Sequence, residues 1–194
     1  PYTTLFRSST YKISEELSTL ASLGTNRIKE LLINYGNDTP IELEAEIYLE
    51  FICFELHIFD KISSNYYDNK FRGEFTNKLT DKMKLNFIDF SRYDNVYPDK
   101  GQAFEFSFHE SFYSYPIEAP ILTQDNNEID SVKNFITRIL IKCNNIDETC
   151  KSFMSHFLPE AFEKFLQEIE ASKSIQQFLK DRKSTRLNSS HQYY

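Results

Sequence analysis

The stretch TPIELEAEIYLEFICFELHIFDKI, residues 39–62, decides the fold that this chain is expected to adopt. Between residues 47 and 59 only two glutamates and one histidine interrupt a run of apolar side chains. A helix that is hydrophobic nearly all round must be covered by neighbours on most of its sides. We therefore predict a central helix over about residues 39–65, with the rest of the chain packed around it.

The start of this helix carries a capping signature. Thr39 followed by Glu42 fits a capping box, and Pro40 sits in the first turn, where a proline loses no needed hydrogen bond. At about 100° per residue most polar side chains fall on one narrow stripe, which predicts a solvent-facing edge made of Glu42, Glu46, Glu50, Cys53, His57 and Lys61.

Two carboxylates of the central helix, Glu44 and Glu55, fall on its apolar side. An unpaired carboxylate in an apolar environment is costly. We therefore single them out as candidate buried carboxylates. Glu55 in particular must be protonated, face a wet pocket, or bind a cation from a neighbouring helix, for which the candidates are Lys82, Arg138 and His156.

Helical periodicity continues on both sides of the central stretch. A preceding helix is predicted over Ser14–Tyr35, capped by Ser14 and ended by Gly36. Three further helices follow in the sequence, with a kink or restart expected at Pro159; they are predicted over Lys70–Tyr93, over Asn127–Cys143, and from an Asn145 cap onward.

The stretch 103–115 fits two structures. Phe104, Phe106 and Phe108 alternate with polar residues as in a strand, whereas Phe104, Phe108, Phe112 and Tyr115 share one helical face. A lone strand would find no partner elsewhere in the chain, so we favour a helix. The fold predicted is all-α, a single compact bundle of five or six mostly antiparallel helices.

Composition suits one globular domain, since 40% of the 194 residues are hydrophobic and 26% are charged. The two ends, residues 1–8 and 182–194, resemble translated sequencing-adapter DNA, so the domain is expected to span residues 9–181. Both end segments hold basic residues and no acidic ones. Without them the net charge moves from -7 to -11.

The acidic balance argues against nucleic acid and against an anionic membrane surface as partners, and favours a basic protein. The longest apolar run is too short to span a bilayer, and no signal peptide is visible, so a cytoplasmic location is expected. Three cysteines cannot all pair, which indicates reduced thiols at Cys53, Cys143 and Cys150.

No motif has the spacing that catalysis or metal binding demands, so we assign no catalytic residue, no metal and no cofactor. Cys53 and His57 are four residues apart, which lets two ligands face one metal, but no second pair accompanies them. The pair therefore remains a weak candidate. A half-buried thiol beside a surface histidine is the preferred explanation.

Two function classes follow from these observations. The first is a small acidic, non-catalytic interaction module, for instance an immunity or accessory protein that binds a basic partner. The second is an enzyme or small-ligand-binding bundle with an aromatic-lined pocket and one buried carboxylate. A solid core with a broad acidic face would favour the first, and a deep apolar cavity with convergent polar groups the second.

Overall fold

The computed structural model describes residues 2–115, 130–143 and 146–180. These residues contain helices and no strand, which confirms the all-α fold. The elements are α1 (Tyr2–Asn34), α2 (Ile41–Ser64), α3 (Asn69–Asp89), the 3-10 helix η1 (Ser91–Tyr93), α4 (Lys100–Phe112), α5 (Asp130–Lys142), α6 (Glu148–Ala171) and a short helical segment over residues 173–180.

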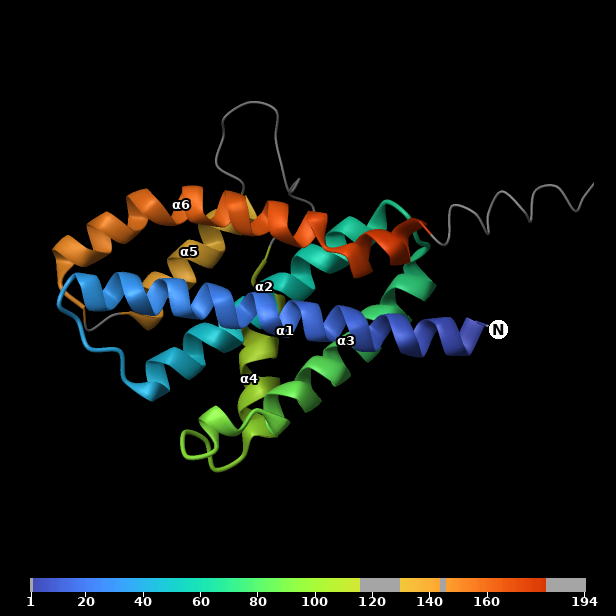
Figure 1. Ribbon diagram of the computed structural model, residues 1–194, viewed down its shortest axis with the longest axis horizontal. Coiled ribbons are helices and arrows are strands. Elements are labelled where there is room, and N and C mark those ends of the chain that lie inside the picture. Colours follow the sequence, from blue (N-terminus) through green and yellow to red (C-terminus); the bar gives the residue numbers. More distant parts are fainter. Residues whose placement is uncertain (1, 116–129, 144–145, 181–194) are drawn as a thin grey trace, which may run out of the picture.

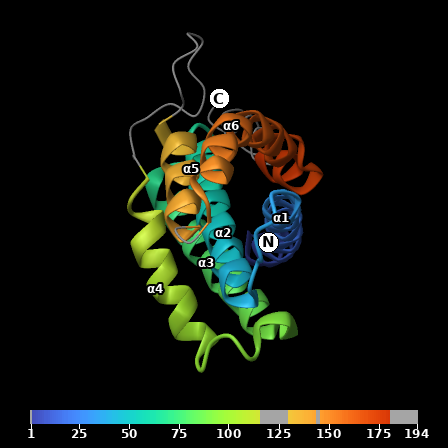
Figure 2. The same ribbon diagram turned by 90° about the vertical axis from the view of Figure 1, so that its left-hand side faces the viewer.

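The helix α2 occupies the centre of the bundle, in contact with α1, α3, α4 and α5 (Figure 1). The helix α1 runs along one side of it, and α6 lies beside α1 and runs in the opposite direction. Figure 2 shows α4 at the outer edge on the other side of α2. The prediction of a central helix is therefore confirmed.

Every residue of α2 from Ile47 to Phe59 is buried. Its aromatic side chains pack against neighbouring helices on different sides of α2. Phe51 lies 5.0 Å from the ring of Phe135 in α5, and Phe59 lies 5.6 Å from that of Phe75 in α3. Such ring pairs contribute about 0.5–1.5 kcal/mol each beyond the area they bury.

Two glycines fix how α1 meets α2. Gly36 has a φ of 74° and ends α1, with Asn37 donating to the carbonyl of Leu32 at 3.0 Å, as a glycine C-cap requires. Gly24 lies against the ring of Phe51, and a Cβ at this position would come within 2.3 Å of that ring. The two helices therefore approach more closely there than any larger residue would allow.

Two predicted helix starts are wrong. The helix α1 already begins at Tyr2, and the Ser14 hydroxyl donates to the Tyr11 carbonyl at 2.8 Å within the helix, so Ser14 is not its cap. The helix α2 has Pro40 at its N-cap without a side-chain hydrogen bond, and the buried Thr39 hydroxyl has no partner. The capping box read from the sequence does not form.

Other helix boundaries differ from the predicted ones. Asp68, Asp99 and Asp147 cap α3, α4 and α6 by accepting backbone N–H groups, each cap contributing about 1 kcal/mol. The stretch 103–115 is helical to Phe112, as favoured. The helix α6 continues through Pro159, so the expected restart is absent. The last residues of the helix predicted over Lys70–Tyr93 form the separate 3-10 helix η1. The Asn145 cap lies outside the described residues.

Candidate functional site

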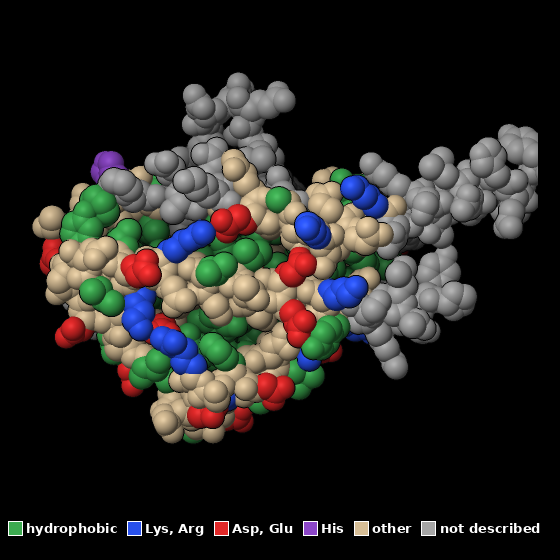
Figure 3. Space-filling model, viewed as in Figure 1, with side chains coloured by type: hydrophobic (Ala, Val, Ile, Leu, Met, Phe, Trp, Pro, Cys, Tyr) green, Lys and Arg blue, Asp and Glu red, His purple; other side chains and the backbone are tan. Residues whose placement is uncertain are grey.

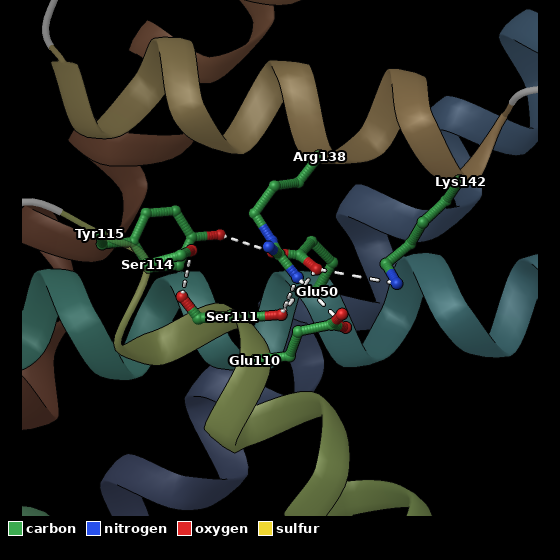
Figure 4. A network of polar contacts seen from close by, with 7 residues as sticks. All are labelled: Glu50, Glu110, Ser111, Ser114, Tyr115, Arg138 and Lys142. Carbon is green, nitrogen blue, oxygen red and sulfur yellow. Dashed lines mark hydrogen bonds and ion pairs between the residues drawn. The ribbon is translucent and has the colours of Figure 1, made fainter.

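The most elaborate polar arrangement of the described residues surrounds Glu50, whose side chain is 1% exposed (Figure 4). One carboxylate oxygen accepts from the Tyr115 hydroxyl and from Nε of Arg138, both at 2.7 Å. The other accepts from the Ser111 hydroxyl at 2.9 Å, and Arg138 also donates to Ser111 at 2.6 Å. Glu50 thus joins α2, the end of α4 and α5.

Two further charges border this cluster. Lys142 lies 3.9 Å from a Glu50 oxygen, and Glu110 lies 3.7 Å from the Arg138 guanidinium. The carboxylate of Glu110 is 56% exposed, whereas Arg138 and Lys142 are 20% and 17% exposed. The charges balance, and only the cations and Glu110 reach solvent.

The candidate pair Cys53 and His57 lies on the same face of α2, next to this cluster. The Cys53 thiol is fully buried, and burial raises its pKa well above the ordinary value. The His57 ring lies 4.9 Å from that of Tyr115, and burial lowers its pKa to about 4, with a smaller contribution from Lys61. Both side chains are buried, so the predicted solvent-facing stripe is wrong at its centre.

Glu44 is 2% exposed and is paired with two cations. Lys29 of α1 and the guanidinium of Arg92 each donate to it at 2.9 Å, and the Tyr93 hydroxyl lies 3.3 Å away. Burial alone would raise the pKa of Glu44, but the hydrogen bonds from Arg92 and Lys29 outweigh it and leave that pKa below 4.5. Its carboxylate is therefore ionised and structural.

Glu55 is fully buried, and neither of its carboxylate oxygens has a hydrogen-bond partner in the described structure. Burial raises its pKa well above 4.5. None of its predicted partners Lys82, Arg138 and His156 forms a hydrogen bond with it. Arg138 binds Glu50 instead. The side chain is therefore a neutral carboxylic acid in an apolar core.

Sequence reasoning named Glu44 and Glu55 but missed Glu50 and the residues that bind it. A helical-wheel projection placed Glu50 on the polar stripe of the helix, because the residues one turn away on both sides of Glu50 are also polar. The better signal was its position inside the apolar run 47–59, in which any polar side chain needs a partner. Its cation, Arg138, was noticed in the sequence but assigned to Glu55.

This geometry does not support catalysis at the buried clusters. Glu50, Ser111 and Cys53 are each 1% exposed or less, so a substrate has no direct path to them. Within the described residues no group of three or more His, Cys, Asp and Glu side chains is arranged to hold a metal ion. No described helix is both long and apolar enough to cross a membrane.

The exposed face of α4 carries large aromatic side chains. Phe106 and Tyr113 are 69% and 65% exposed, and they stand seven residues apart with the exposed His109 between them. This spacing places all three on one side of the helix over about 10 Å. The His109 ring lies 5.2 Å from that of Tyr113. We call these three residues the aromatic stripe.

Carboxylates border the aromatic stripe on both sides. Glu105 and Glu110 are 67% and 56% exposed, and each has a nearby cation on a neighbouring helix, Lys84 and Arg138. Elsewhere the surface is mixed: Figure 3 shows acidic side chains interspersed with lysines and arginines on the α1 side of the molecule. That side of the molecule therefore presents no broad, purely acidic face.

Comparisons with known proteins found no matching family model, no matching curated protein and no matching solved structure.

Proposed function

We propose that this chain is a non-catalytic interaction protein that binds a basic protein partner through the aromatic stripe. The observation that carries the proposal is the exposure of Phe106 and Tyr113 on one side of α4 and its C-cap. Large aromatic side chains that fill a partner's pocket supply most of the binding energy in many interfaces. Both side chains lie largely in water, although the Tyr113 ring also packs against Phe108 and Phe112.

Charge selects the kind of partner. The stripe lies between Glu105 and Glu110, and the whole chain carries a net charge of -7. A partner with an apolar pocket rimmed by lysine or arginine complements both features, whereas a second copy of this chain would bring like charges together. The same charge argues against nucleic acid as the partner, and a cytoplasmic location is part of the proposal.

The test is a capture experiment from a lysate of the native host. Wild-type protein is compared with the double variant Phe106→Ser, Tyr113→Ser, and with Leu85→Ser as a matched control, because Leu85 is 51% exposed on α3. We expect wild type and control to retain the same basic protein, and the double variant to bind it at least about tenfold more weakly after purification.

Salt provides the second readout. Binding of the purified partner should weaken as ionic strength rises, since exposed charges are screened within about 10 Å at 0.1 M salt. Equal capture by all three proteins would contradict the proposal. So would a self-associated wild type that the double variant converts to a monomer, because the stripe would then bind a second copy.

A specific observation also favours the alternative of a small-ligand-binding bundle, namely the two unpartnered oxygens of Glu55. A bound molecule could supply the missing hydrogen bonds. Native mass spectrometry of the purified protein distinguishes the two functions. The interaction proposal predicts the mass of the chain alone, and a retained small molecule that Glu55→Leu abolishes would establish the alternative.

A further inference from the structure

A groove of about 560 Å³ lies between α1 and the end of α3, with Tyr48 of α2 in its lining. Binding sites for small molecules commonly measure roughly 300 to 1,000 Å³. Among the described residues no lysine or arginine lines the groove, and the described lining is made of Glu15, Ser18, Thr19, Ser22, Tyr48, Asn86, Asp89 and Phe90.

The hydroxyl and amide donors of this groove are already engaged within the protein. The Ser18 hydroxyl donates to the sulfur of Met83 at 3.6 Å, and Thr19 and Ser22 donate to carbonyls of α1 at 2.8 and 3.0 Å. The amide of Asn86 donates to the Ser18 oxygen at 3.2 Å. The polar atoms that remain available to a ligand are therefore mainly hydrogen-bond acceptors.

The groove also carries two negative charges. Glu15 projects from α1 and Asp89 from the end of α3, both are exposed, and neither forms an ion pair with a described residue. The neighbouring Tyr11 hydroxyl is neutral, and its interaction with Glu15 raises its pKa. The carbonyl oxygen of Asn86 adds an acceptor. A complementary ligand must be cationic and rich in N–H donors.

Two rings complete the lining. The half-buried Phe90 and the buried Tyr48 lie 5.6 Å apart by ring centroids. Aromatic faces attract ammonium groups and also pack against methylene chains. We propose that this groove binds an aliphatic polyamine, with one ammonium group at each carboxylate and the carbon chain lying along the half-buried Phe90.

A second groove along α1 shows why the first is the better site. It lies between α1 and α6, measures about 370 Å³ and also includes Glu15. Its other carboxylates have partners within the protein: Ser174 donates to Glu16 at 2.5 Å, and Arg27 pairs with Glu168 at 3.2 Å. Lys173 supplies a positive charge there. It therefore lacks the unsatisfied acceptors that would recognise a cation.

Spermidine is the probe for the test, titrated into the full chain by calorimetry and by NMR, with the neutral diol of matching length as the control ligand. We expect saturable binding of spermidine only, with shifts at Ser18, Ser22 and the Asn86 amide. The double variant Glu15→Gln, Asp89→Asn should weaken binding at least about tenfold. Glu74→Gln, an exposed substitution on α3 outside the groove, should leave binding unchanged.

Two results would overturn the proposal. One is the absence of saturable binding at millimolar spermidine. The other is binding that the double variant does not weaken, which would reveal a general attraction to an acidic protein. A lysine-rich peptide that shifts the groove residues when spermidine does not would assign the groove to a protein interface instead. The Phe106→Ser, Tyr113→Ser variant should bind spermidine normally, so this test is independent of the stripe.

Discussion

The two halves of α2 bury carboxylates in different ways. In the first half, Glu44 and Glu50 each receive cations and hydroxyl donors from neighbouring helices. In the second half, Glu55 is buried as deeply but has no hydrogen-bond partner within the described residues. In spite of burial, hydrogen bonds from Arg92 and Lys29 hold the pKa of Glu44 below its ordinary value. Burial without such partners raises the pKa of Glu55 well above its ordinary value.

The largest expected effect comes from removing a cation in the first half. Arg138→Met leaves the carboxylate of Glu50 buried beside only hydroxyl donors and the more distant Lys142. Removing one partner of a buried pair typically costs about 3–5 kcal/mol, because the remaining charge is uncompensated. Urea unfolding followed by circular dichroism measures this loss.

Arg27→Met is the control for this substitution. Arg27 and Glu168 form an exposed pair, with side chains 49% and 40% exposed, and such pairs contribute about 0–1 kcal/mol. Equal losses in the two variants would show that the Glu50 cluster is no more important than a surface ion pair. The contrast between the halves of α2 would then be wrong.

An intermediate effect of opposite sign is expected in the second half. Glu55→Leu replaces a neutral acid without hydrogen bonds by an apolar side chain of similar size, so stability should rise by about 1–3 kcal/mol. Glu50→Leu should instead lower stability, because it leaves Arg138 without its carboxylate. A loss of stability in Glu55→Leu would mean that Glu55 has a partner that the described structure does not show.

The same substitution should change how stability depends on pH. Burial raises the pKa of Glu55 above 4.5, so above that pH the unfolded chain releases a proton that the folded chain keeps. The pH-dependent part of the cost is therefore absent at low pH, and it grows as pH rises toward the folded pKa. The advantage of Glu55→Leu over wild type should widen over the same range, as urea titrations at several pH values would show.

The smallest effect concerns Glu44, which has two cations. Lys29→Met removes one, but Arg92 remains, and the Lys29 side chain is 30% exposed. We expect a loss of about 1 kcal/mol or less by urea unfolding. A loss as large as that of Arg138→Met would show that the two cations act together. Lys29→Met with Arg92→Met should then cost no more than the single substitution.

The sequence predicted the fold well where apolar periodicity was strong. The all-helical bundle, the central position of α2 and the end of α1 at Gly36 all follow from local patterns. Helix starts were predicted less well, because Asp147 and Asp99 compete with other polar residues nearby as caps. Only the backbone conformation decides which of them accepts the free N–H groups.

The clusters around Glu50 and Glu44 show what periodicity cannot supply. A helical wheel assigns a residue to a face of its own helix, but whether that face is covered depends on helices far away in the sequence. Arg138 and Tyr115 reach Glu50 from α5 and from the end of α4. The aromatic stripe was missed for a different reason, since the prediction for 103–115 named the face of Phe104, Phe108 and Phe112 and made no statement about the opposite side of the helix.

The contact between Gly24 and Phe51 has a consequence for how this sequence can diverge. Because a methyl group at position 24 would overlap the ring, the two positions cannot change independently. Loss of the ring leaves a void that a protein can survive, whereas a larger residue at position 24 forces α1 away from α2. In descendants that keep this fold, the two positions should therefore covary, with the change at position 51 coming first.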